Sequence, residues 1–125
     1  MKKILTAAFC AAMASPALAQ GWPTGYEGVI LQGFYWDSYS DSQWKNLEKQ
    51  APELGSYFSL LWVPQSGKCL EEHNVMGYTP YYYFDQNSSF GSEAELRSMI
   101  RAMHQNGVGV LADVVINHHN TSGWF

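Results

Sequence analysis

The sequence predicts an α/β fold in which helices cover a parallel sheet. Three runs, at residues 29–36, 58–63 and 108–116, are almost continuously apolar, as strands buried on both faces are. Two stretches with helical spacing of apolar residues, at 42–55 and 92–106, separate these runs. Strands and helices therefore alternate along the chain, which is typical of right-handed βαβ units around a parallel sheet.

The first strand is expected at residues 29–36 and the first helix directly after it. Apolar residues between Trp44 and Leu54 repeat at i, i+3, i+7 and i+10, and Asp41 or Ser42 is a plausible N-cap. A proline in the last turn is expected to kink or shorten the helix, which should end at the following glycine. The second strand, at residues 58–63, should stop at the next proline.

The stretch from Gln65 to Gly91 has no sustained periodicity and is rich in Gly, Tyr, Asn and Ser. A loop of this length is expected to be functional or to contain small elements of its own. The second helix has the clearest signals, because Ser92 and Glu95 form a capping box and an Asn-Gly pair stops it. The third strand follows at residues 108–116 and is apolar apart from Asp113.

Two architectures fit this order of elements, an open doubly wound sheet and a closed (β/α)8 barrel. A Gly-rich dinucleotide or phosphate loop after the first strand would favour the open sheet, but the sequence contains neither motif. In both architectures, ligands bind at the carboxyl ends of the strands. Candidate functional residues are therefore those at 35–37, at 62–64 with the long loop, and at 117–120.

The composition favours a sugar ligand over a nucleic acid. Aromatic residues make up 15% of the chain and charged residues 14%, and the net charge of -4 offers no basic surface for a nucleic-acid partner. Tyr78 lies in the segment GYTP, where Gly and Pro fix the backbone and direct the ring outward from a loop. The remaining aromatic candidates are expected to belong to the core: Trp36, Trp62, Tyr82, Tyr83 and Phe84.

The residues from Asp113 to His118 form the sharpest constellation. Asp113 is expected to be a buried structural acid, because an ionised carboxylate inside an apolar strand needs hydrogen-bond partners. Asn117 could offer a hard oxygen ligand to calcium, and His118 could hydrogen-bond a substrate hydroxyl. The adjacent pair His118 and His119 is a weak indication of a transition metal, since consecutive side chains point in different directions.

Residues 1–19 have the pattern of a secretory signal peptide. Two lysines precede an apolar run, and the sequence ALA at 17–19 is a cleavage signature, so Gln20 is expected to become the first residue. The mature protein is then expected to be secreted or periplasmic, with no membrane anchor. Its remaining Cys69 has no partner for an intrachain disulfide.

The segment DVVINH at residues 113–118 resembles the first signature motif of the α-amylase family of glycoside hydrolases, which lies along the third barrel strand. Four further segments resemble that family in the same order: LQGFYWD at 31–37, LWVP at 61–64, GYTPY at 77–81, and residues 90–96 with 104–107. Two positions depart from the family pattern. Gln65 stands where the family usually has a second proline, and Tyr82 stands where it has an acid.

The resemblance implies that residues 20–125 are the amino-terminal part of a (β/α)8 barrel, with about three strands and two helices. It implies that Tyr78 stacks on the sugar next to the scissile bond, that His118 hydrogen-bonds that sugar, and that Asn117 helps to ligate a structural calcium. Asp113 would be structural. The family's catalytic carboxylates lie at the ends of strands four, five and seven, so no catalytic residue is assigned in this chain.

The implied parent enzyme hydrolyses α-1,4-glucosidic bonds of starch or malto-oligosaccharides with retention. Retention needs two carboxylates about 5 to 5.5 Å apart, and this chain offers no such pair to nominate. The chain alone is therefore expected to be inactive. The alternative is a non-catalytic glucan-binding protein or an inactive truncated remnant.

Overall fold

The computed structural model describes residues 25–71 and 73–120, so the expected signal peptide at residues 1–19 lies outside the described residues. Three strands form a parallel sheet: β1 (Ile30–Gln32), β2 (Leu60–Val63) and β5 (Gly109–Ala112). The sheet order β1-β2-β5 places β2 in the centre. Two helices connect these strands, α1 (Trp44–Leu54) and α2 (Glu93–Gln105), and the predicted α/β alternation is confirmed.

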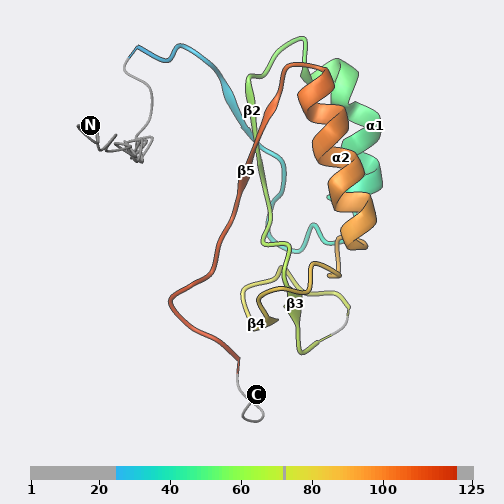
Figure 1. Ribbon diagram of the computed structural model, residues 1–125, viewed down its shortest axis with the longest axis vertical. Helices are drawn as coiled ribbons and strands as arrows, with labels where there is room; N and C mark the ends of the chain where they lie inside the picture. The colour runs from blue at the N-terminus through green and yellow to red at the C-terminus, as the bar shows by residue number, and fades with distance from the viewer. Residues whose placement is uncertain (1–24, 72, 121–125) are drawn as a thin grey trace, which may run out of the picture.

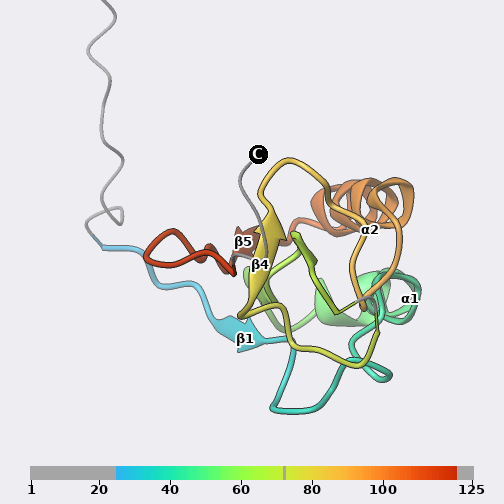
Figure 2. The same cartoon turned by 90° about the horizontal axis from the view of Figure 1, so that it is seen from below.

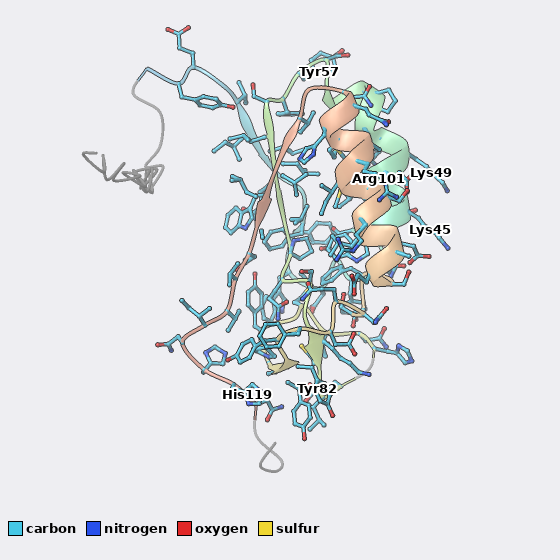
Figure 3. All side chains as sticks on the ribbon, viewed as in Figure 1. Lys45, Lys49, Tyr57, Tyr82, Arg101 and His119 are labelled. Atoms are coloured by element: carbon cyan, nitrogen blue, oxygen red, sulfur yellow. The ribbon has the colours of Figure 1, made fainter. Side chains whose placement is uncertain are left out.

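Both helices pack on the same face of the sheet (Figures 1 and 2). Their apolar stripes meet there, and the side chains of Trp44, Met99 and Met103 are fully buried beside Leu61 of the central strand. Lys45, Lys49 and Arg101 lie on the outer side of the helices, away from the sheet (Figure 3). The amphipathic spacing read from the sequence therefore orients both helices correctly.

The expectation that the strands are buried on both faces is wrong for the described residues. Val29 and Ile30 are exposed, and Trp62 on the central strand is 37% exposed. The two helices cover one face only, and the described chain contains no element that covers the other. Apolar composition thus located the three strands, but it overestimated the length of the first and the third and did not predict their surroundings.

The sequence predicted the amino-terminal cap of α2 correctly but not that of α1. The capping box of α2 is confirmed, because the Ser92 hydroxyl accepts from the Glu95 amide and the Glu95 carboxylate accepts from the Ser92 amide at 2.8 Å. The N-cap expected for α1 is wrong: the position belongs to Gln43, whose side chain makes no cap hydrogen bond. The Ser42 hydroxyl instead donates to that of Ser38, 2.9 Å away in the interior.

The long segment after β2 contains a small antiparallel pair, β3 (Lys68–Cys69) and β4 (Pro80–Tyr82). This pair lies beyond the end of the sheet at which β2 and β5 finish (Figure 1). It therefore confirms that the loop carries elements of its own, and it places them at the carboxyl edge of the strands. Neither helix of the described residues is long and apolar enough to cross a membrane.

Candidate functional site

The candidate site is formed where the segment around β4 meets the chain that follows β5. The amide of Asn120 donates to the carbonyl oxygen of Pro80 at 2.8 Å. The hydroxyl of Tyr83 donates to the carbonyl oxygen of His118 at 3.1 Å. These bonds join two segments that are about forty positions apart in the sequence, and they do so at the sheet edge where α/β proteins bind ligands.

Tyr78 lies at the centre of this site and is half-buried. Its hydroxyl donates to Oδ2 of Asp113 at 3.0 Å. Its ring is parallel to that of Trp36, with an angle of 4° between the planes and 6.1 Å between the centroids. Burial, the hydrogen bond to Asp113 and the negative charge of that carboxylate raise the pKa of Tyr78 to about 12.

The backbone directly before Tyr78 is held by the side chain of Gln65. Its amide nitrogen Nε2 donates to the carbonyl oxygen of Gly77 at 2.8 Å. Gly77 has a φ of +94°, and a Cβ atom at this position would lie 2.7 Å from the Gln65 carbonyl oxygen. Only glycine fits here without strain. Gln65, which stands where the resembled family usually has a second proline, therefore helps to hold the backbone that leads to Tyr78.

His118 is exposed and lies beside Tyr78, as the strand-end argument predicts. Its Nε2 is 2.8 Å from the carbonyl oxygen of Tyr78. A carbonyl oxygen can only accept, so Nε2 carries the proton and donates. This bond orients the imidazole ring and leaves its Nδ1 atom to face another partner.

Asp113 does not lie inside a strand, because β5 ends at Ala112. It is half-buried, and its carboxylate accepts the hydrogen bond from Tyr78. The expectation of a deeply buried acid within the strand is therefore wrong. The expected need for a hydrogen-bond partner is confirmed, and the partner is itself a candidate sugar-binding residue.

Asn117, the predicted calcium ligand, is exposed. Calcium takes six to eight oxygen ligands. Within residues 25–71 and 73–120, no group of three or more His, Cys, Asp or Glu side chains could hold a metal ion. Asn117 stays a predicted calcium ligand, and no cluster of such side chains accompanies it among the described residues.

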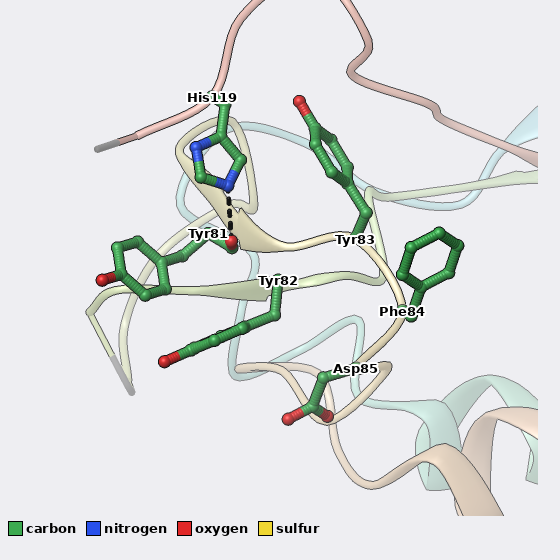
Figure 4. Close-up of a pocket in the computed structure, with 6 residues that line it drawn as sticks. All are labelled: Tyr81, Tyr82, Tyr83, Phe84, Asp85 and His119. Atoms are coloured by element: carbon green, nitrogen blue, oxygen red, sulfur yellow. Dashed lines mark hydrogen bonds between the residues drawn. The ribbon is translucent and has the colours of Figure 1, made fainter. Parts of the chain in front are cut away.

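An aromatic pocket of about 510 Å³ is lined by residues of β4, of the segment directly after it and of the chain that follows β5 (Figure 4). Its wall includes His119, whose Nε2 donates to the carbonyl oxygen of Tyr81 at 2.5 Å and whose ring stacks on that of Tyr81. The full lining is Tyr81, Tyr82, Tyr83, Phe84, Asp85 and His119. The sequence indicates His119 only as a weak metal ligand, and no sequence pattern predicts its place in this wall.

The aromatic residues expected in the core are exposed instead. Trp36 is 70% exposed and Phe84 is 98% exposed, and Tyr82 and Tyr83 are each more than 40% exposed. They lie on loops, on the uncovered face of the sheet or around the aromatic pocket, so their residue type predicted burial that the described chain does not provide. Trp36 in particular joins the candidate site that sequence reasoning had centred on Tyr78.

Comparisons with known proteins agree with this arrangement. No family model matches the chain. It is 38% identical over 91 residues to probable alpha-amylase 2 of Arabidopsis thaliana, which covers 72% of this chain and 21% of that protein. It is 36% identical over 140 aligned positions to glucan 1,4-alpha-maltotetraohydrolase of Roseateles saccharophilus, which covers 96% of this chain and 25% of that protein.

A solved structure shows the same fold. Alpha-amylase I of Eisenia fetida superposes with a TM-score of 0.63 at 24% sequence identity, covering 77% of this chain and 19% of that structure. The chain thus spans about a quarter or less of the proteins it matches. Together with the parallel sheet and its helices, these matches show that the chain belongs to the α-amylase family of glycoside hydrolases and represents part of their (β/α)8 barrel.

Proposed function

We propose that this chain forms one wall of the glucan-binding cleft of an α-amylase-type enzyme that hydrolyses α-1,4-glucosidic bonds. The observation that carries the proposal is the cluster of Trp36, Tyr78 and His118 at the carboxyl edge of the sheet. Aromatic rings suit the apolar C–H faces of a sugar, and neighbouring polar atoms suit its hydroxyl groups. The substrate would be starch or a malto-oligosaccharide.

The geometry suggests a role for each side chain. Tyr78 would offer its ring to a glucose unit, while Asp113 binds its hydroxyl. His118 uses Nε2 to hold the Tyr78 carbonyl, so Nδ1 is the atom that would accept a hydrogen bond from a sugar hydroxyl. This assignment requires a neutral imidazole, because a protonated Nδ1 could only donate.

Hydrolysis with retention requires a nucleophilic carboxylate and a general acid about 5 to 5.5 Å apart. We assign neither to this chain, and the proposal places both in parts of the protein outside it. The experiment is expression of the full-length gene product with starch as substrate, followed by proton NMR of the first products. Release of reducing sugar in the α-configuration supports the proposal, whereas β-configured products would contradict retention. Residues 20–125 alone, as the control, should release none.

A non-catalytic glucan-binding protein, or an inactive truncated remnant, is the alternative. The exposure of Trp36 next to Tyr78 favours binding whether or not turnover follows. Affinity electrophoresis of the full-length protein through starch separates the two functions. Retardation by starch without release of reducing sugar would establish the alternative and reject the enzyme.

Export and calcium binding belong to the same proposal. Cleavage after residue 19 predicts that the protein recovered from the periplasm or medium begins at Gln20, which amino-terminal sequencing would show. Calcium would need several further oxygen ligands besides Asn117. An Asn117→Ala variant of the full-length protein should then lose calcium more readily during dialysis, measured by atomic absorption.

A further inference from the structure

We propose that Asp113 is a positioning residue for the glucan-binding site. It fixes the orientation of the Tyr78 ring and the direction in which the Tyr78 hydroxyl donates its proton. The inference rests on the proposed function and adds a role for a residue that the sequence indicated only as structural. It starts from the 3.0 Å hydrogen bond between the Tyr78 hydroxyl and Oδ2 of Asp113.

Four different side chains restrain Tyr78, at its backbone, its ring plane and its hydroxyl. The Gly77 and Tyr78 carbonyls are held by Gln65 and His118, so the backbone that carries the ring is fixed. The Trp36 ring lies parallel to the Tyr78 ring and restrains its plane. The far end of the ring is held by Asp113, because the hydroxyl donates to its carboxylate. Removal of this bond would leave the tip free to swing about the Cα–Cβ bond.

A carboxylate also determines which way the hydrogen bonds run. An ionised Asp accepts only, so the Tyr78 hydroxyl must give it its single proton. The lone pairs of the phenol oxygen then remain available to a ligand. A sugar hydroxyl at this position has to donate to Tyr78, which makes the site selective for the orientation of that hydroxyl. The titratable groups in contact with Tyr78 are Asp113, through the hydroxyl, and His118, through the backbone.

The chain contains a second Tyr–Asp pair that serves as a matched control. The hydroxyl of Tyr35 donates to Oδ2 of Asp41, and both residues are exposed on the loop before α1. This pair has the same chemistry, but it does not restrain the Tyr78 ring. Asp41→Asn should therefore leave glucan binding unchanged.

The test is a double-mutant cycle in the full-length protein, with a thio-linked maltohexaose that resists hydrolysis as the probe and calorimetry as the measurement. Asp113→Ala is expected to weaken binding about tenfold, the usual effect of losing one hydrogen bond to a charged group. In a Tyr78→Phe background, which lacks the hydroxyl, the same change should weaken binding no further. Asp113→Asn retains an acceptor oxygen but not the charge, so it should recover part of the affinity. Equal losses in both backgrounds would overturn the inference.

A second measurement does not depend on maltohexaose. The absorbance of ionised tyrosine near 295 nm is titrated in the full-length protein, and the part that belongs to Tyr78 is found by difference from Tyr78→Phe. Asp113→Asn should move this part to lower pH, because a negative neighbour is lost, while Asp41→Asn should not. If the unmutated protein does not bind maltohexaose, the proposed function fails. A Tyr78 titration that shifts in Asp113→Asn would then still support the coupling of the two side chains. A Tyr78 titration that does not shift would overturn that coupling.

Discussion

The Tyr78 hydroxyl is neutral in the fold up to a higher pH than in an unfolded chain. Its pKa is raised to about 12 from 10.0, first by burial and then by Asp113. As pH rises above about 10, the unfolded chain loses this proton before the folded one does, so the contribution of Tyr78 to stability falls and is lost by about pH 12. The free energy of unfolding should therefore decline over this range, measured by urea titration of the full-length protein at fixed pH steps.

Tyr78→Phe provides the comparison for this prediction, because phenylalanine does not ionise. The decline between pH 10 and 12 should be shallower in this variant. A residual decline is expected from Tyr35, whose pKa is raised by its hydrogen bond to Asp41. Identical pH profiles for the unmutated protein and Tyr78→Phe would show that Tyr78 ionises alike in the folded and unfolded states.

Individual site residues were predictable where local chain chemistry restricts the backbone. The Gly and Pro on either side of Tyr78, and the position of His118 after a strand, led to two residues that the structure brings together. Trp36 was among the candidates at the strand ends but was assigned to the core, because a tryptophan suits a core and a sugar site equally well by composition. Its exposure depends on which parts of the chain cover it, and this is decided by tertiary packing.

At the scale of single elements, the amino-terminal end of α2 depends on the capping box. Ser92→Ala removes the side chain that accepts from the Glu95 amide, and it should lower the free energy of unfolding by about 1 kcal/mol. Thermal and urea unfolding of the full-length protein would measure this loss. Ser40→Ala is the control, because Ser40 is exposed and its hydroxyl donates a long hydrogen bond of 3.4 Å to the Asp41 carboxylate. An equal effect of both substitutions would contradict the capping role.

The carboxyl-terminal ends of the two helices approach each other at Gly55. This residue has ordinary helical dihedral angles, but a Cβ atom there would collide with the carbonyl oxygen of Asn106. Gly55→Ala should therefore destabilise the protein by roughly 1–3 kcal/mol, although alanine is normally the better helix former. The neighbouring exposed residue offers the comparison, and Ser56→Ala should change the urea midpoint little. A stabilised Gly55→Ala protein would show that the helix ends separate at little cost.

Helices were predicted better than strands, and the reason lies in their interactions. The helix signals are local, within one stretch of chain, whereas a strand is only as long as its pairing partner. The register pairs Val63, the last residue of β2, with Ala112 of β5, and the residue after β2 is a proline that has no amide hydrogen to donate. β5 therefore ends at Ala112, four residues before the apolar run does. Hydrophobicity alone could not reveal this limit.

At the scale of the whole chain, the described part is a barrel segment with open edges. β1 and β5 are the outer strands of the sheet, and large apolar side chains such as Ile116, 82% exposed, lie on the uncovered surface. Residues 20–125 expressed alone should therefore self-associate, because unpaired strand edges and exposed apolar patches favour contact with other chains. Sedimentation velocity at increasing concentration would show the association. A monomer with one cooperative thermal transition would contradict it.

The hydrogen bond between Gln65 and Gly77 has a consequence for how this chain can vary. It joins the two ends of the loop at residues 65–77, which contains β3. The position of Tyr78 is therefore set by this hydrogen bond and not by the length of the loop. Lengthening a closed loop costs little, about 0.6 kcal/mol for each doubling. Residues inserted between the exposed His73 and Asn74 could therefore be used to graft a new binding segment or a label onto this protein without displacing the Tyr78 ring.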